Sequence, residues 1–154
     1  MREKTTVALC LFLLLTALLH LKIVPLDVKS SSSSPVHNVN TGLNYTSIQA
    51  AVDASETLAG HTIFVEEGVY HEYLIINKAL SFVGENRNNT IIDGNGMGVI
   101  VHIVADNVTF QNFTVRNGYI GLHLDYSDNS SILENSVLDN DDAVLVRYSN
   151  TSVI

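Results

Sequence analysis

The chain has 154 residues, of which 46% are hydrophobic, and it carries a formal net charge of −8 and a single cysteine. After residue 29, four Lys and Arg side chains face fourteen Asp and Glu side chains, so the chain lacks the basic surface that nucleic-acid phosphates require. We therefore expect no nucleic-acid partner. We also expect burial and stacking to stabilise the fold, because one cysteine cannot form an intramolecular disulfide.

The N-terminus combines positive charge with an apolar run. Basic residues at positions 2 and 4 precede an apolar stretch that covers residues 7–19 and continues less purely to residue 26. This pattern is typical of a secretory signal peptide or an uncleaved membrane anchor. We expect residues 1–26 to form a hydrophobic helix of this kind. It would direct the chain to a secreted or cell-surface location and attach it to the membrane if it is not cleaved.

A polar linker and a short helix are expected next. Five serines and a proline make residues 27–42 a low-complexity spacer that buries no core. Residues 46–49 (TSIQ) match a capping box with Thr46 as the N-cap. The helix that follows should end near residue 55 and carry an apolar face made of Ile48, Ala51 and Val52. We expect it to cover the open end of the fold.

The rest of the chain reads as short strands with an internal repeat. Short apolar segments around turns predict strands at 62–66, 73–76 and 79–83. Residues 99–104 are so continuously apolar that we expect a further strand there, buried or crowded on both faces. Segment 126–132 (YSDNSSI) returns 22 residues later as 148–154 (YSNTSVI), and 121–124 (GLHL) returns as 143–146 (AVLV). A period in the low twenties is too short for a helical hairpin and predicts one turn of a strand coil per repeat.

These features predict an all-β fold, a right-handed parallel β-helix. We expect residues 43–154 to form this solenoid of roughly 22-residue coils, with the short helix as its N-terminal cap and an incomplete last coil at residue 154. Stacked strands lie about 4.8 Å apart, so residues one coil apart become neighbours. Three pairs of turn asparagines are predicted to bond their side-chain amides up the stack: Asn112 with Asn135, Asn117 with Asn140, and Asn107 with Asn129.

The first half of this domain resembles the N-terminal part of the pectin-lyase-like β-helix superfamily, through residues 45–54 (YTSIQAAVDA), 62–72 (TIFVEEGVYHE), 81–86 (SFVGEN) and 90–94 (TIIDG). The continuation to residue 154 resembles the NosD-like and CASH-type repeat proteins of exported surfaces. The resemblance implies the β-helix fold. It leaves the function open, because the same scaffold carries enzymes and proteins without known chemistry.

Three functions are compatible with this resemblance. The first is a cell-surface protein that binds carbohydrate or builds the envelope without catalysis, with polysaccharide or envelope components as partners. The second is a polysaccharide-acting enzyme, similar to pectate lyases, polygalacturonases or pectin esterases, whose full site lies beyond this chain. The third is a NosD-like copper-maturation factor, which only the resemblance implies.

Asp141 and Asp142 are the candidate catalytic residues of the enzyme alternative. Neighbouring carboxylates on a rigid face divide the roles of acid and base in glycoside hydrolysis, and residues 140–144 (NDDAV) resemble the paired-aspartate stretch of polygalacturonases. Ile120 stands where that family has a further aspartate. The competing interpretation is a polar turn that bounds a strand.

His102 and His123 are the candidate metal ligands. They are 21 residues apart and each sits between apolar neighbours, so we expect them to point outward from adjacent coils and nearly touch. Two imidazoles at that distance hold a transition metal such as copper only with further ligands, and Asp125 is the nearest candidate. Calcium is the other candidate cofactor, at the turn carboxylates Asp106, Asp125 and Asp128, with solvated turn acids as the alternative interpretation.

Tyr126 and Tyr148 are predicted to stack at one repeat spacing. The stack is either a platform for sugar rings or an aromatic ladder that packs only against itself. Six sequons are candidate glycosylation sites if the host modifies exported chains, and their asparagines are Asn44, Asn88, Asn107, Asn112, Asn129 and Asn150. The alternative is that turns rich in Asn and Thr produce sequons by chance.

Overall fold

The computed structural model describes residues 34–150, 152 and 153. The predicted signal or anchor helix, residues 1–26, lies outside the described residues. In the part of the chain that is described, no helix is long and apolar enough to span a membrane.

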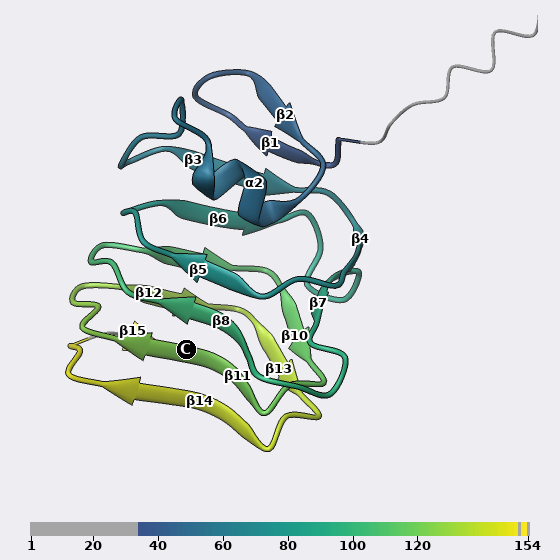
Figure 1. Cartoon of the computed structure of the whole chain (residues 1–154), viewed down its shortest axis with the longest axis vertical. Helices are drawn as coiled ribbons and strands as arrows, with labels where there is room; N and C mark the ends of the chain where they lie inside the picture. Colours follow the sequence, from purple (N-terminus) through teal and green to yellow (C-terminus); the bar gives the residue numbers. More distant parts are fainter. Residues whose placement is uncertain (1–33, 151, 154) are drawn as a thin grey trace, which may run out of the picture. The chain divides into compact units, whose positions relative to one another are not determined.

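Short parallel strands wind into four coils that stack along one axis (Figure 1). Each coil gives one strand to each of three sheets, so neighbours within a sheet are three strands apart in the chain. The predicted all-β parallel β-helix is therefore confirmed. The coil strands are β3 (Thr62–Val65), β4 (Gly68–Tyr70), β5 (Leu74–Ile76), β6 (Ser81–Gly84), β7 (Thr90–Asp93), β8 (Val99–Ile103), β9 (Thr109–Gln111), β10 (Thr114–Arg116), β11 (Ile120–Asp125), β12 (Ser131–Leu133), β13 (Ser136–Leu138) and β14 (Asp142–Arg147), and β15 (Ser152–Val153) continues the first sheet.

The register between the last coils follows the sequence repeat. Leu122 pairs with Val144 and His123 pairs with Leu145, as the returning segments predict. Contacts between the turns of these coils also recur at a separation of 22 residues. The earlier coils differ in length, because Ser81 pairs with Thr62 on one side and with Thr109 on the other. The regular period is thus a property of the C-terminal part of the described chain.

A β-hairpin extends the first sheet beyond the first coil. β1 (Val36–Asn38) pairs antiparallel with β3 and with β2 (Leu43–Tyr45). The sequence places residues 36–38 in the polar linker, but Val36 and Asn38 are fully buried in the sheet. The side chains of this strand alternate between buried and half-buried positions, so the folded chain begins before the expected boundary.

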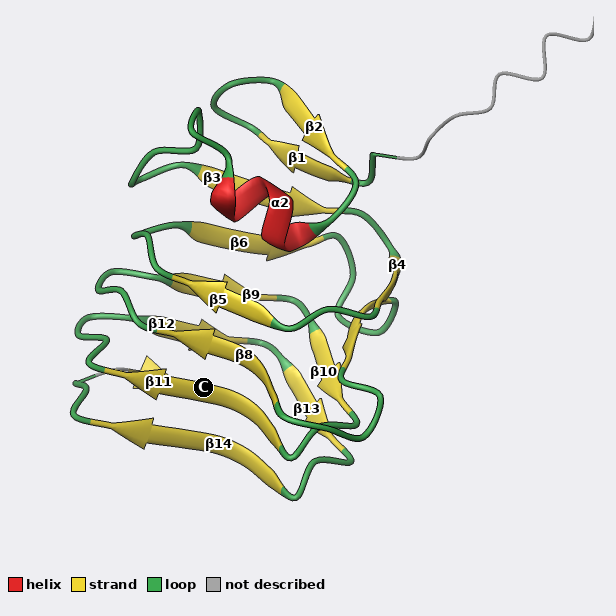
Figure 2. Ribbon diagram, viewed as in Figure 1, coloured by secondary structure: helices red, strands yellow, loops and turns green. Residues whose placement is uncertain are grey.

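The predicted capping helix is present as α2 (Ile48–Asp53), which contacts β1, β2 and β5 (Figure 2). It buries the predicted apolar face, Ile48, Ala51 and Val52. The predicted N-cap is wrong by one residue, because Ser47 and not Thr46 accepts a hydrogen bond from the third helical N–H group. The first two helical N–H groups donate to the carboxylate of Glu72 at 3.0 and 2.9 Å. A residue from the first coil therefore completes the cap.

The interior is filled by ladders of apolar residues from successive coils. One ladder stacks Ile63, Phe82, Phe110 and Ile132 through the register of the first sheet. The rings of Phe82 and Phe110 have centroids 6.0 Å apart, and Phe113 stacks on Phe110 at 4.4 Å. Burial of one such side chain contributes about 1.5–3 kcal/mol. The fold is thus stabilised by burial, as expected for a chain without disulfides.

The turns place residues with left-handed backbone at the coil period. Positive φ angles recur 22 residues apart in four pairs: Asn107 (58°) with Asn129 (55°), Asn112 (63°) with Glu134 (53°), Asn117 (59°) with Asp139 (52°), and Tyr126 with Tyr148 (both 48°). Asparagine and aspartate tolerate this conformation better than other residues with a side chain. This backbone requirement explains why the turns are rich in these residues.

The predicted amide ladder is wrong for Asn112 with Asn135 and for Asn117 with Asn140, because pairs 23 residues apart are one residue out of register. The Phe113 N–H donates to Oδ1 of Asn135 at 2.9 Å, and the Gly118 N–H donates to Oδ1 of Asn140 at 2.8 Å. The Nδ2 groups of the same two asparagines donate to backbone carbonyls of the coil before. Each amide therefore joins two coils through backbone groups and not through another side chain.

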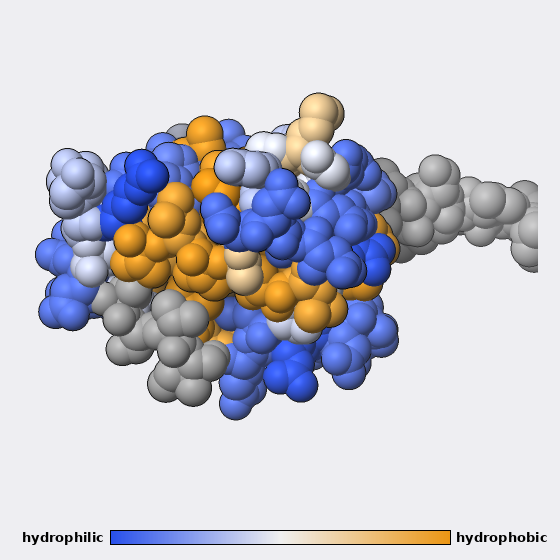
Figure 3. All heavy atoms as spheres, turned by 90° about the horizontal axis from the view of Figure 1, so that it is seen from below, coloured by the Kyte–Doolittle hydropathy of each residue, from blue (hydrophilic) through white to orange (hydrophobic). Residues whose placement is uncertain are grey.

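The end of the coil at β14 exposes positions that are buried one coil earlier. Leu124 is fully buried, whereas its register partner Val146 is 41% exposed. β13 and β14 are the last described strands of their sheets, so no described coil covers them from below. Figure 3, which views the molecule from this end, shows apolar side chains at the surface there.

Candidate metal centre

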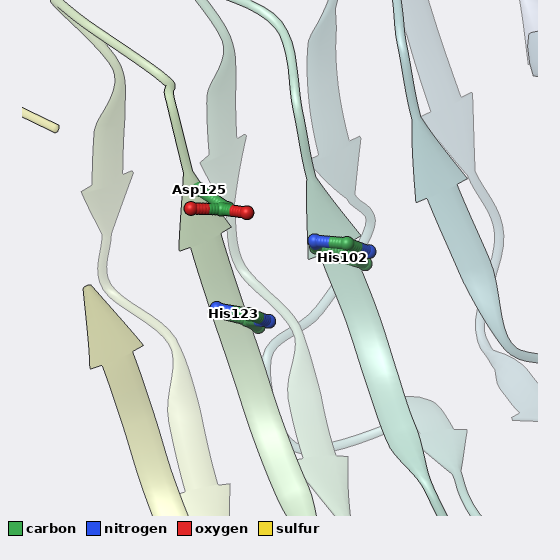
Figure 4. Close-up of side chains that lie close together, drawn as sticks. All are labelled: His102, His123 and Asp125. Atoms are coloured by element: carbon green, nitrogen blue, oxygen red, sulfur yellow. The ribbon is translucent and has the colours of Figure 1, made fainter. Parts of the chain in front are cut away.

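Two histidines face each other on the outer side of the third sheet. β8 carries His102 and β11 carries His123, and the two residues are register partners in parallel strands. Their rings stack with centroids 4.7 Å apart and an interplanar angle of 5° (Figure 4). The strand alternation sets this orientation, because the neighbours of each histidine along its strand are buried. The prediction that they point outward from adjacent coils and nearly touch is confirmed.

Asp125 lies two residues beyond His123, on the same face of β11 (Figure 4). Among the described residues, these three form the only group that places three ligand atoms within 4.8 Å of one another. The Nε2 atoms of His102 and His123 and Oδ1 of Asp125 are buried without a hydrogen-bond partner in the described chain. Buried polar atoms normally have partners, so these atoms are available for a ligand. The three residues, named here the histidine site, fit a metal ion.

The surroundings favour the neutral form of His123. Burial lowers the pKa of His123, and the charges of His102 and Arg147 lower it further, while Asp125 acts in the opposite direction. Arg147 acts from the next coil, because it is the register partner of Asp125. The neutral imidazole is the form that binds a metal ion, so the site need not release a proton from His123 at neutral pH.

A metal ion can join both rings only if they turn toward each other. A nitrogen ligand lies about 2.0–2.1 Å from a transition-metal ion, so two nitrogens on one ion are at most about 4.2 Å apart. The nearly parallel rings, with centroids 4.7 Å apart, direct their nitrogen lone pairs side by side. Rotation of one or both side chains would be needed to direct the lone pairs at one ion, and Asp125 is the residue that would supply a third ligand.

Asp141 and Asp142 lie at the opposite end of the third sheet from the histidine site. Both side chains are exposed, and Asp142 is the first residue of β14. His123 pairs with Leu145, three residues from Asp142, which is about 10 Å along a strand. The structure therefore brings neither histidine beside the two aspartates. Their catalytic role stays a prediction.

Asp141 instead lines a polar cavity of about 410 Å³ at the turns before β8, β11 and β14. The other lining residues are Asp93, Asn95, Gly96, Asn117, Gly118, Tyr119 and Asp139. The sequence did not indicate this cavity, because its walls come from turns of three successive coils. Of the two candidate catalytic residues, Asp141 therefore lines the cavity and Asp142 does not.

Asp93 fixes one wall of the cavity through an ion pair in which its own side chain is buried and that of Arg116 is partly exposed. The Arg116 Nε and the Asn117 Nδ2 both donate to Oδ2 of Asp93 at 2.9 Å, and the Asn95 N–H donates to Oδ1 at 3.0 Å. Burial raises the pKa of the Asp93 carboxyl, but these hydrogen bonds and the charge of Arg116 outweigh it, so the pKa lies below its ordinary value. Arg116 follows Asp93 by 23 residues, and only the coil register makes them neighbours.

Tyr126 and Tyr148 stack as predicted. Their ring centroids are 4.8 Å apart at an interplanar angle of 16°, and the residues are 66% and 74% exposed. They follow β11 and β14 directly. Tyr119 lies before β11, at its other end, and lines the cavity. The tyrosine pair therefore presents an aromatic surface on the turn next to Asp125.

The three calcium candidates are not gathered around one point. Oδ1 of Asp106 accepts from the Asp128 N–H at 2.7 Å, and Oδ1 of Asp128 accepts from the Asn150 N–H at 2.8 Å. These two carboxylates thus bond to the backbone of the next coil. Asp125 belongs to the histidine site instead.

The sequon asparagines differ in exposure. Asn112 is half-buried, whereas the others, Asn44, Asn88, Asn107, Asn129 and Asn150, are exposed. Thr90, the hydroxyl residue of the Asn88 sequon, is fully buried. Glycosylation of these asparagines stays a prediction.

Comparisons with known proteins agree with this fold. The pectin methylesterase from Yersinia enterocolitica superposes with a TM-score of 0.63 and 24% identity over 70% of this chain and 46% of that chain. Pectin methylesterase PemA from Erwinia chrysanthemi gives a TM-score of 0.59 and 18% identity over 71% of this chain and 43% of that chain. At these identities the likeness shows the β-helix fold alone.

A sequence relative and a family model are more informative. A "Cell surface glycoprotein" of Methanothermus fervidus is 28% identical over 108 residues, which are 70% of this chain and 18% of that protein. The chain thus spans less than a fifth of the length of this relative. Residues 22–154 match the family model described as "Periplasmic copper-binding protein (NosD)". Because the match covers most of the sequence, the chain belongs to the NosD family.

Proposed function

We propose that this chain is part of an exported, right-handed β-helix protein of the cell surface, and that its histidine site binds a transition-metal ion, with copper as the favoured metal. The right-handed winding follows the general preference of parallel crossover connections, about 98% of which are right-handed. Export is supported by the apolar N-terminal run, by the cell-surface relative and by the periplasmic family.

One observation carries the metal proposal: His102, His123 and Asp125 bring three ligand atoms within 4.8 Å of one another, and each of them has a buried polar atom without a hydrogen-bond partner among the described residues. A stacked pair of histidines that served only for packing would leave two ring nitrogens without partners, at a free-energy cost for each. A bound cation removes that cost. Among divalent first-row ions, copper binds nitrogen and oxygen donors most tightly, and copper is the metal that the family description names.

Copper titration of the full chain, prepared without a histidine tag, tests this proposal. We expect Cu²⁺ to bind with one ion per chain at the histidine site, and the His102→Ala, His123→Ala double variant to lose this ion. His71→Ala is the matched control, because His71 is exposed and lies outside the histidine site. Unchanged Cu²⁺ uptake by the double variant would exclude this site.

A carbohydrate-binding or envelope-building role is the second candidate. It is supported by the exposed stack of Tyr126 and Tyr148, since aromatic faces can pack against the C–H faces of sugar rings. Polysaccharide or other envelope components would be the partners. Binding of neutral oligosaccharides should weaken about 5- to 30-fold in a Tyr126→Ala, Tyr148→Ala variant, by loss of roughly 1–2 kcal/mol of stacking. Equal binding by the variant and the wild type would exclude this surface.

The polysaccharide-acting enzyme has the least structural support of the three functions, because the described residues give neither candidate carboxylate a charged partner. The described ion pairs are His37 with Glu66 and Arg116 with Asp93, and neither contains Asp141 or Asp142. Retaining and inverting glycosidases place two carboxyl groups on opposite sides of the scissile bond. Loss of detectable sugar turnover in Asp141→Asn or Asp142→Asn would favour the enzyme over both binding functions.

A further inference from the structure

All donor atoms of the histidine site are nitrogen or oxygen. His102 and His123 offer imidazole nitrogens and Asp125 offers carboxylate oxygens. The chain has one cysteine and two methionines, and Met97 is the only one of them that the structure describes. Met97 is 67% exposed in the turn before β8. It lies five residues before His102, about 16 Å along an extended chain, so no described sulfur reaches the site.

The type of donor separates the two oxidation states of copper. Soft thiolate and thioether sulfur atoms select Cu⁺, whereas tetragonal sets of nitrogen and oxygen atoms are typical of Cu²⁺. The carboxylate of Asp125 adds a negative charge, and its attraction is greater for the ion of higher charge. Both effects favour Cu²⁺ at the histidine site.

The arrangement of the two rings favours the same ion. Both rings project from the same face of the sheet and lie within 5° of parallel. This arrangement sets the two rings side by side on one face of the sheet and not on opposite sides of an ion. Cu⁺ bound by two imidazoles prefers the opposed, linear arrangement. Cu²⁺ accepts two adjacent nitrogens and an oxygen in a tetragonal set.

We infer that the histidine site discriminates between the oxidation states of copper: it binds Cu²⁺ and holds Cu⁺ much more weakly. This inference rests on the proposed metal-binding function and specifies which form of copper the site takes. His102, His123 and Asp125 set the preference together, through donor type, charge and the side-by-side placement of the rings.

The test compares the affinities of the full chain for the two ions. Cu²⁺ is titrated in air against nitrilotriacetate, and Cu⁺ is titrated without oxygen against bicinchoninate, with ascorbate as the reductant. We expect Cu⁺ to bind at least about 100-fold more weakly than Cu²⁺. The electron paramagnetic resonance spectrum of bound Cu²⁺ should be tetragonal and carry nitrogen couplings from the two imidazoles.

A second test introduces a sulfur ligand beside the histidine site and measures whether Cu⁺ then binds more tightly. Leu145 is the register partner of His123 on β14, so Leu145→Met adds a thioether to the same column at little change in volume. Cu⁺ should then bind at least about tenfold more tightly, while Cu²⁺ affinity stays unchanged. Leu138→Met on β13 is the control and should alter neither affinity, because Leu138 lies on another sheet.

The possible results separate the inference from the function on which it rests. If the wild type binds Cu²⁺ and Cu⁺ within about tenfold of each other, the preference is wrong although the metal site stands. If neither ion binds, or if the His102→Ala, His123→Ala variant binds Cu²⁺ like the wild type, the proposed function itself fails. Weak Cu⁺ binding that Leu145→Met strengthens supports both.

Discussion

His102 and His123 are register partners whose rings stack at 4.7 Å, yet neither Nε2 atom has a hydrogen-bond partner among the described residues. This relationship depends on the parallel register of β8 and β11. A shift of one residue would turn one imidazole into the interior and an apolar side chain outward, because side chains alternate along a strand. The core ladders hold the register, so the packing of the interior positions the pair on the surface.

Replacing Asp125 by Asn should weaken Cu²⁺ binding at least about tenfold, since even residues that only orient a ligand contribute that much to metal affinity. The substitution keeps the size of the side chain and removes its charge. Isothermal titration calorimetry measures the change. Asp128→Asn is the control, because its carboxylate bonds to the backbone of Asn150 and lies outside the histidine site. An equal loss in both variants would mean that the effect is one of general charge.

Removal of the positive charge beside the site should strengthen Cu²⁺ binding. Arg147 is the register partner of Asp125, and its charge lowers the pKa of His123, so it also repels a cation bound there. Arg147→Gln should raise the affinity about fivefold at low salt, from Coulomb repulsion over about 8 Å in water. The gain should shrink as the ionic strength rises. Arg87→Gln, an exposed charge on the turn after β6, should have no effect.

The Asp93 ion pair should make stability depend on acid pH. The pKa of Asp93 is lower in the folded chain than its ordinary value, so the unfolded chain binds the proton more readily. The stability that Asp93 contributes is therefore present above about pH 4. It is lost as the pH falls through the lower pKa of the folded state.

Urea unfolding at a series of pH values measures this dependence. Asp93→Asn should be less stable than the wild type at pH 7 by roughly 1–3 kcal/mol, and the difference should narrow as the pH falls below about 4. Asp141→Asn is the control, because the Asp141 side chain is exposed. A constant difference between Asp93→Asn and the wild type from pH 7 to pH 2 would contradict the argument.

Gly84 should not tolerate a side chain. A Cβ atom there would overlap the backbone carbonyl of Asn112 in the next coil. Gly84→Ala should therefore lower the free energy of unfolding by about 1–3 kcal/mol, the usual effect of overpacking. Gly68→Ala is the matched control, since its Cβ would meet the Tyr70 ring at an ordinary 3.5 Å. Thermal unfolding measures the stability of both variants. Equal unfolding midpoints for Gly84→Ala and Gly68→Ala would show that the coils can move apart at Gly84.

The sequence predicted the coil and the residues that stack on its regular part. The apolar run at 99–104 predicted β8 within one residue, and the return of 121–124 as 143–146 predicted the pairing of β11 with β14. Local alternation decides which side chains point inward, and a fixed period decides which of them meet. For this reason the pairings of His102 with His123 and of Tyr126 with Tyr148 could be predicted.

The sequence did not predict features that depend on how turns join separate coils. The repeat spacing predicted a side-chain contact between Asn112 and Asn135. With the left-handed turns, Asn135 instead accepts a hydrogen bond from the backbone N–H of Phe113. The sequence also placed β1 in the linker, because three residues are too few for a pattern and their burial comes from pairing with β3. The Asp93–Arg116 ion pair and the polar cavity come from turns of different coils.

The amino-acid sequence by itself determined the repeat, the inward and outward faces of the strands and the types of donor that the chain can offer to a metal. Only the tertiary structure decided that Asp125 joins the two histidines and that Nε2 of each histidine and Oδ1 of Asp125 have no hydrogen-bond partner among the residues that the structure describes. The physical reason is that periodicity is written in neighbouring residues, whereas the hydrogen bonding of a side chain depends on everything that packs around it.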